Sequence, residues 1–175
     1  MKITLTQLCH HRWILPILSG LHQQNGGSKF VTLLNRLKLS RDSLSRTLQI
    51  MLELQLISRN TVYAHPLRPE YILIDQKLGE HAYNLIQQLE PDQETLLNKW
   101  ALPTLLALQT HHQFSRLLEV LPSITSRALT MTLKDLEQHG YVRHQQRQYI
   151  LTPTGEQIAN AIALLGGSRA IRNPI

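Results

Sequence analysis

The spacing of apolar residues between positions 114 and 152 predicts two helices followed by a hairpin. In the first part, apolar residues recur every three or four positions, as on one face of a helix: Phe114, Leu117, Leu118 and Leu121. A second series begins after Thr125, a good N-cap residue, and ends before Gly140, a good helix stop: Leu129, Leu133 and Leu136. From Tyr141 to Leu151 the period is near two on either side of a polar tip, which predicts a short β-hairpin.

Two short helices across a tight turn, followed by a hairpin, are the pattern of a winged helix-turn-helix, whose second helix can lie in the major groove of DNA. That helix, predicted over 126–139, carries polar side chains on the face opposite its leucines: Ser126, Arg127, Thr130 and Lys134. Arg147 lies in the predicted hairpin, the second wing. These residues are candidate DNA contacts, and the alternative is that they form the solvated face of an ordinary amphipathic helix.

The same pattern occurs a first time nearer the start of the chain. Arg12-Trp13-Ile-Leu-Pro16 returns as Lys99-Trp100-Ala-Leu-Pro103, which indicates an internal repeat. Proline three residues after the tryptophan is tolerated only in the first turn of a helix, so we expect one helix to begin near Arg12 and another near Lys99. The apolar positions of the next two helices also correspond, in the first copy at Phe30, Leu33, Leu34, Leu37, Leu44, Leu48 and Met51.

The first copy predicts a second DNA-reading helix, over 41–54. The segment between this helix and the one before it is one residue shorter than in the other copy. Gln55 stands where the other copy has Gly140. The first wing is longer, because Tyr71 follows Arg59 by more positions than Tyr149 follows His144. Candidate DNA contacts on the polar face of this helix, and one in its wing, are Arg41, Ser45, Arg46, Gln49 and Arg68.

The run from Phe114 to Thr152 resembles the HxlR family of bacterial winged-helix transcriptional regulators, and the stretch from Val62 to Leu73 resembles the wing of that family. The resemblance implies a regulator that binds double-stranded DNA. The sequence departs from the family by carrying the pattern twice, since the usual member is one such domain that dimerises. Redox-responsive members carry a cysteine well upstream of the tryptophan. Cys9 lies only four residues before Trp13, so thiol sensing is not carried over.

We therefore predict a mainly α protein with small β-hairpin wings (α+β), built from two tandem winged helix-turn-helix domains. The first domain is expected over 1–90 and the second over 91–165, with a flexible tail over 166–175. The segment 78–98 is predicted to be a largely helical connector with a break at Pro91. In family dimers the terminal helices form the subunit interface. The resemblance thus implies that the two copies pack as a pseudo-dimer within one chain, and a linear tandem is the alternative.

Composition supports a folded protein with an acidic partner. The 175 residues are 42% hydrophobic and 17% charged, with a net charge of +6. A sequence pI of about 9.8 favours nucleic acid as that partner. Residues 1–90 hold 10 Lys and Arg against 6 Asp and Glu, and residues 91–175 hold 8 against 6, which favours the first copy as the stronger DNA reader. The chain shows no export signal or membrane span, so we expect it to be cytoplasmic.

Other chemistries receive little support from the sequence. A single cysteine excludes an intramolecular disulfide, and His10 and His11 beside it lack a second ligand cluster at metal-binding spacing. We find no phosphate-binding loop, catalytic triad or paired carboxylates, so we predict no enzyme activity, metal or cofactor. The predicted function is a sequence-specific, double-stranded DNA-binding transcriptional regulator. The alternative is a winged-helix protein-interaction adaptor with little affinity for DNA, and homodimer formation is left open.

Overall fold

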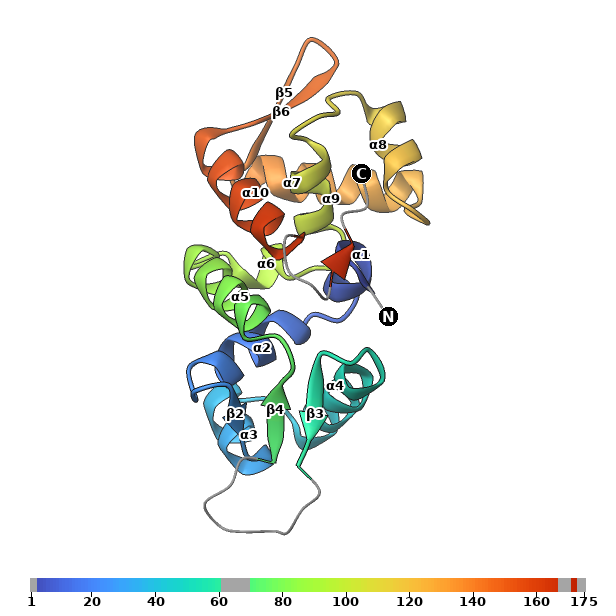
Figure 1. The fold of residues 1–175 in the computed structure, drawn as a ribbon. Helices are drawn as coiled ribbons and strands as arrows, with labels where there is room; N and C mark the ends of the chain where they lie inside the picture. Colours follow the sequence, from blue (N-terminus) through green and yellow to red (C-terminus); the bar gives the residue numbers. More distant parts are fainter. Residues whose placement is uncertain (1–2, 61–69, 167–170, 173–175) are drawn as a thin grey trace.

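The computed structural model describes residues 3–60, 70–166 and 171–172 (Figure 1). The first half begins with a two-residue strand and continues through helices and short strands to a long helix. In chain order these elements are β1 (Ile3–Thr4), α1 (Leu5–Cys9), α2 (Ile14–His22), β2 (Gly27–Ser28), α3 (Phe30–Leu37), α4 (Arg41–Glu53), β3 (Ile57–Arg59), β4 (Tyr71–Leu73) and α5 (Gln76–Gln88). Much of the first wing, including Arg68, lies outside the described residues.

The second half has a closely similar order of elements. They are α6 (Gln93–Leu96), α7 (Ala101–Ala107), α8 (Phe114–Val120), α9 (Ser126–Gln138), β5 (Val142–Gln145), β6 (Gln148–Leu151) and α10 (Pro153–Gly166), followed by β7 (Ile171–Arg172). The prediction of a mainly helical protein with small hairpins is confirmed. The helices predicted over 41–54 and 126–139 are observed with ends that differ by a single residue.

The starts of α2 and α7 explain the repeated tryptophan and proline. Trp13 and Trp100 are the N-cap residues of these helices, and Pro16 and Pro103 lie in the first turn, where a missing backbone N–H removes no helical hydrogen bond. Both indole rings are half-buried and pack against the core. A cation covers each ring: Arg12 lies 5.3 Å from the Trp13 centroid, and Lys99 lies 4.7 Å from that of Trp100.

The strands among the described residues form three small sheets. In the first half, β4 pairs antiparallel with both β2 and β3. In the second half, β5 and β6 form an antiparallel hairpin, and the Tyr149 N–H donates to the His112 carbonyl over 2.8 Å. This bond lies just before α8, as β2 lies just before α3. The segments that lead into α3 and α8 are thus each hydrogen-bonded to a wing strand of the same half.

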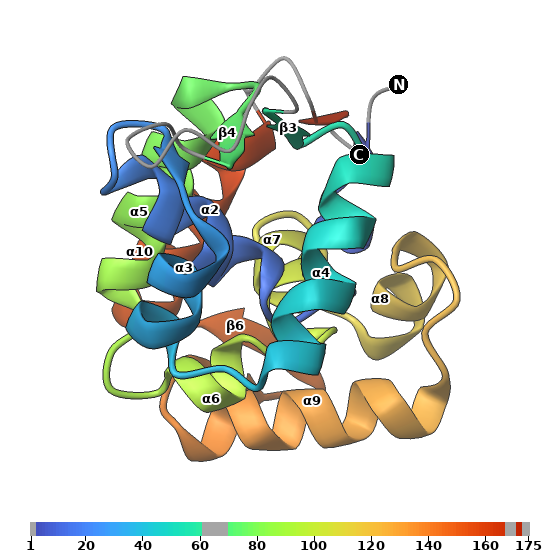
Figure 2. The ribbon, with the colours of Figure 1, turned by 90° about the horizontal axis from the view of Figure 1, so that it is seen from below.

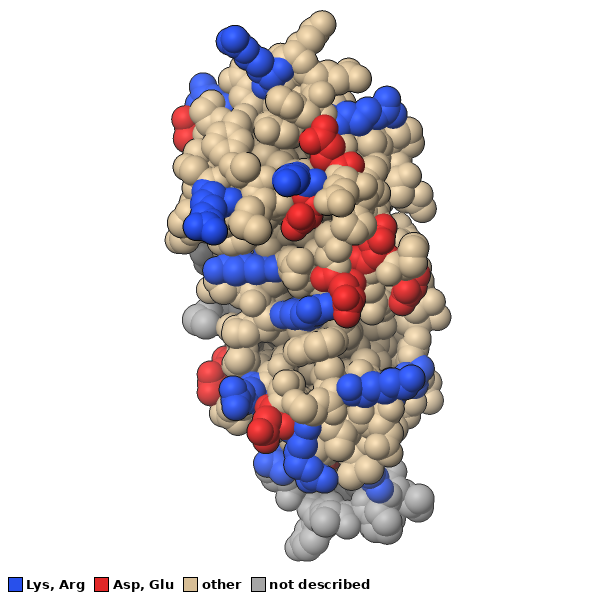
Figure 3. Space-filling view, turned by 180° about the vertical axis from the view of Figure 1, so that it is seen from behind, with Lys and Arg blue, Asp and Glu red and all other residues tan. Residues whose placement is uncertain are grey.

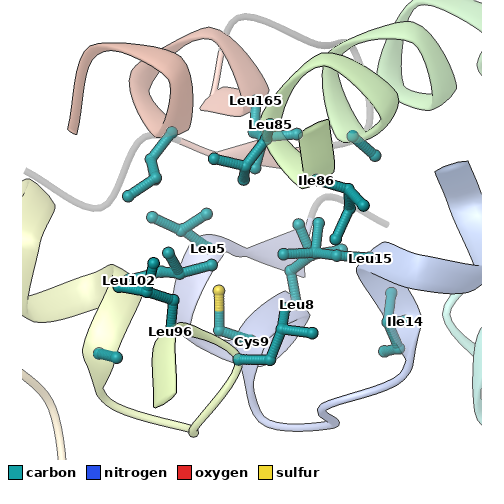
Figure 4. Packing of buried hydrophobic residues seen from close by; sticks show 14 of the residues in the cluster. Leu5, Leu8, Cys9, Ile14, Leu15, Leu85, Ile86, Leu96, Leu102 and Leu165 are labelled. Atoms are coloured by element: carbon teal, nitrogen blue, oxygen red, sulfur yellow. The ribbon is translucent and has the colours of Figure 1, made fainter. Parts of the chain in front are cut away.

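The two halves share one hydrophobic core. Helix α5 packs against α2 of its own half and against α10 of the other half, and α10 in turn packs on α7 (Figure 1). Short N-terminal helix α1 also contacts α7. Buried side chains from both halves meet between these helices, as Figure 4 shows for Leu5, Leu8, Leu85, Leu102 and Leu165. The connector segment predicted to be helical is therefore part of the packing between the halves.

The C-terminal residues depart from the sequence prediction. Positions 166–175 were expected to be a flexible tail, but Ile171 and Arg172 form a strand that pairs in parallel with Ile3 and Thr4. A two-residue strand has no detectable period, and its partner lies at the opposite end of the sequence, so the local pattern held no signal for it.

Candidate nucleic-acid interface

Helix α4 is fixed by its cap and by one apolar face. The Ser43 N–H donates to the Ser40 hydroxyl over 3.2 Å, which caps the helix at its start. Leu44, Leu48 and Met51 are buried beneath it, at the spacing of one helical face. The opposite face is therefore turned to solvent.

That face carries the four residues of α4 predicted to contact DNA. Arg41, Ser45, Arg46 and Gln49 are all exposed. The Arg41 guanidinium lies 5.6 Å from the ring centroid of Phe30, the first residue of α3, so the ring helps to hold it at the start of α4. The Gln49 amide donates to the Glu53 carboxylate over 3.0 Å one turn later. Its carbonyl oxygen has no protein partner among the described residues.

Helix α9 is built in the same way. The Ala128 N–H donates to the Thr125 hydroxyl over 3.2 Å at the N-cap, and the apolar face is buried at Leu129, Leu133 and Leu136. The predicted DNA contacts on the other face are exposed: Ser126, Arg127, Thr130 and Lys134. The Thr130 hydroxyl donates to the Ser126 carbonyl over 2.8 Å, so toward a ligand it can act only as an acceptor.

The second wing ends in a two-residue turn at Gln146 and Arg147. Both have positive φ, 48° and 65°, as tight hairpins of this kind require. Arg147 is exposed at this tip. Along the hairpin, the His144 ring stacks on that of Tyr149 at a centroid distance of 4.4 Å. At the base of the first wing, Arg59 forms an ion pair with Glu70 at 2.9 Å.

The predicted cations are available to a polyanion. Within the described part of the chain, ion pairs form at Arg12, Arg59 and Arg116, and none involves the cations of α4, α9 or the second wing tip. Figure 2 shows α9 lying along one side of the molecule, with the first turn of α4 directed toward that side. Figure 3 shows lysine and arginine side chains along the whole length of this face, with acidic side chains interspersed. Both helices can therefore approach a duplex from this side.

Sequence reasoning missed two exposed residues of the second unit. Arg143 lies on β5 and adds a cation to the wing. Met131 lies on α9 among the polar residues and is 56% exposed. The position of Met131 could have been found from the repeat, because it corresponds to Arg46 of α4 once the residue missing from the first copy is allowed for.

The second half thus contains a helix pair, α8 and α9, followed by a hairpin and a closing helix, α10. Residues 95–168 match the HxlR-like helix-turn-helix family. The predicted resemblance is therefore confirmed for one copy, which includes α7, α8, α9 and the second wing. The first copy lies outside the matched residues. No curated protein and no solved structure matches the chain.

The cysteine and histidines do not form a site of another kind in the described residues. Cys9 is buried among α1 and its neighbours (Figure 4), and burial raises the pKa of its thiol to about 12. The thiol is therefore protonated and poorly nucleophilic at neutral pH. Burial lowers the pKa of His11, and the nearby His10 lowers it further. Within 3–60, 70–166 and 171–172 there is no cluster of metal-ligating side chains and no helix that could span a membrane.

Proposed function

We propose that the chain is a transcriptional regulator that binds double-stranded DNA through two winged helix-turn-helix units, over 1–90 and 91–165. The observation that carries the proposal is the exposed polar row on α4 and on α9, each with cations unpaired by described residues. The family match of residues 95–168 supports the same function for the second unit. In this reading α4 and α9 are the two recognition helices.

The two units act as a pseudo-dimer on one duplex. Packing between α5 and α10 supports this arrangement, because it joins the units through the helices that follow the wings. Hairpin β5–β6 and strands β3 and β4 lie toward opposite ends of the molecule (Figure 1). A single chain can then place one recognition helix in each of two major-groove segments on the same face of DNA, with the wings over the flanking backbone.

The exposed side chains suit distinct parts of the duplex. Arg41 and Arg46 can each form two hydrogen bonds to a guanine edge, and Gln49 can pair with adenine once Glu53 releases its amide. Ser45 and Ser126 suit phosphate or base-edge contacts, and Thr130 can accept from an amino group at a base edge. Lys134 and Arg147 provide charge toward the backbone. The resulting site is asymmetric because the two helices differ in sequence.

The test is binding of the full chain to duplexes selected from a random pool, measured as a function of salt. We expect affinity to fall steeply as salt rises, because each phosphate contact releases counterions. Arg41→Ala and Arg46→Ala together should weaken binding about tenfold or more, at unchanged helix content. Lys77→Ala, which removes one exposed cation from α5, is the control for the loss of a positive charge outside α4 and should change binding little.

Two results would contradict the proposal. One is the absence of DNA binding even at low salt, which would favour the protein-interaction adaptor. The other is equal binding by the Arg41 and Arg46 variant and by the Lys77 variant, which would show that α4 does not face the duplex.

A further inference from the structure

The two recognition helices can be compared position by position. Each has 13 residues, a capping hydroxyl residue before it, and buried leucines at its fourth and eighth positions. Aligning these leucines aligns the exposed rows as well. The resulting pairs are Arg41 with Ser126, Ser45 with Thr130, Arg46 with Met131, and Gln49 with Lys134. In three of these pairs both residues are polar. In the pair of Arg46 with Met131, a thioether replaces a guanidinium.

Met131 is an apolar side chain in the middle of a polar row. It is 56% exposed, and its neighbours on the helical surface about one turn before and after it, Arg127 and Lys134, are exposed as well. The leucines of α9 that form the core face inward, so Met131 contributes little to that core. Lone exposed apolar residues are common on protein surfaces. Here the position is informative because it corresponds to Arg46, in the row that the proposed function places in the major groove.

The major groove offers one apolar group to such a side chain. Guanine, adenine and cytosine present hydrogen-bonding groups at their edges, whereas thymine adds a C5-methyl group that apolar side chains contact. A methionine can neither donate two hydrogen bonds to guanine nor pair with adenine, and its flexible thioether stem adapts well to a methyl surface. Arg46 at the matching place in α4 has the opposite preference, since a guanidinium fits the O6 and N7 of guanine.

We propose that Met131 selects a thymine, through its C5-methyl group, at the position of the α9 half-site where Arg46 selects a guanine in the α4 half-site. This inference rests on the proposed function and specifies the duplex it recognises. The preferred DNA is an imperfect palindrome, and this pair of residues accounts for one of the differences between its halves: guanine in the α4 half-site and thymine in the α9 half-site.

The first experiment is duplex selection with the full chain and, in parallel, with Met131→Arg. The half-site that changes between the two selections is the one read by α9, and its thymine should be replaced by guanine. The reciprocal variant Arg46→Met should replace the guanine of the other half-site by thymine. Both substitutions lie on exposed faces, so we expect circular dichroism to show an unchanged helix content.

The second experiment removes only the methyl group. Each thymine of the selected duplex is replaced in turn by deoxyuridine, and the dissociation constant is measured for the full chain and for Met131→Ala. At one thymine, loss of the methyl group should weaken DNA binding by the unaltered chain about fourfold, which is the effect expected for one buried carbon. The same replacement should leave DNA binding by Met131→Ala unchanged. Leu164→Ala, which truncates an equally exposed apolar residue on α10, is the control and should retain the methyl dependence.

The outcomes distinguish a failure of the role proposed for Met131 from a failure of the proposed function. If selected duplexes bind but no thymine shows a methyl effect that depends on Met131, the role of Met131 is wrong and the proposed function stands. A Met131→Arg selection identical to that of the unaltered chain leads to the same conclusion. If no duplex binds at low salt, the proposed function fails and the inference fails with it.

Discussion

Gln55 and Gly140 occupy the same place after helices α4 and α9, and both have a left-handed backbone, with φ of 55° and 78°. Each is followed by the same hydrogen bond, from the next N–H to the carbonyl five residues earlier: Leu56 to Met51 and Tyr141 to Leu136, both 2.9 Å. This pair of turns is the Schellman motif that often ends helices. The two helices therefore stop in the same way, although only one carries the glycine that this turn favours.

We expect Gly140→Ala to lower the free energy of unfolding by about 1 kcal/mol, because a side chain disfavours the left-handed conformation. A Cβ atom at this position meets nothing within 4 Å, so the cost is conformational and not steric. Gln55→Gly should have the opposite sign and raise stability by a similar amount. Urea denaturation monitored by circular dichroism measures both. If Gln55→Gly instead lowered the stability, the Gln55 side chain would contribute more to the free energy of unfolding than its left-handed backbone costs.

The sequence repeat predicted this equivalence and much of the fold, because helices of 13 residues display their period clearly. The starts at Phe30 and Phe114 follow from the period of apolar residues. Those at Arg41 and Ser126 follow also from the capping hydroxyl residue before each helix. Strand β7 and its pairing with Ile3 and Thr4 could not be predicted, since two-residue strands depend on contacts between distant segments. For the candidate site, exposure of the polar rows followed from the pattern. The sequence pattern did not single out Met131, because an apolar side chain does not fit the polar row.

Gly155 lies in the first turn of α10 against the backbone that ends α9. A Cβ atom there would lie 2.1 Å from the Tyr141 carbonyl oxygen, which is part of the backbone and cannot move aside as a side chain can. We expect Gly155→Ala to destabilise the protein by about 2 kcal/mol or more. Gly20 in α2 is the matched control, because the nearest atom to its added Cβ is a Leu33 methyl at 3.6 Å.

The Gly20→Ala variant should be neutral or more stable by about 0.5–1 kcal/mol, since alanine is the better helix former. Thermal denaturation of the two variants beside the unaltered chain makes the comparison. Equal effects of the two substitutions would contradict the close approach of α10 to Tyr141.

Tyr141 links the base of the second wing to the connector between the halves. Its hydroxyl donates to the Asp92 carboxylate over 2.8 Å, and burial, then this bond, raises the pKa of Tyr141 to about 12. At neutral pH, Tyr141→Phe should lower the free energy of unfolding by about 1 kcal/mol, the net contribution of one hydrogen bond.

The raised pKa of Tyr141 also predicts a pH dependence of known sign. Between pH 10 and about 12 the unfolded chain releases the phenolic proton while the folded chain keeps it, so the stability that Tyr141 contributes falls as pH rises. Removing the hydroxyl should flatten this alkaline fall. Urea midpoints measured at intervals from pH 7 to 11 test the effect. An unchanged alkaline slope in Tyr141→Phe would mean that the phenol titrates equally in both states.

The shared core predicts that the two halves unfold together, and the chain carries a reporter in each half. Trp13→Phe leaves only Trp100 as a fluorophore, and Trp100→Phe leaves only Trp13. Leu44 and Leu129 are fully buried at corresponding places under α4 and α9, so Leu→Ala at either should cost about 2–5 kcal/mol. Because α5 packs on α10, each substitution should lower the denaturation midpoint equally for both tryptophans. If Leu44→Ala shifted the Trp13 midpoint and left that of Trp100 in place, the halves would be independent domains, and the rigid spacing of α4 and α9 on one duplex would lose its physical basis.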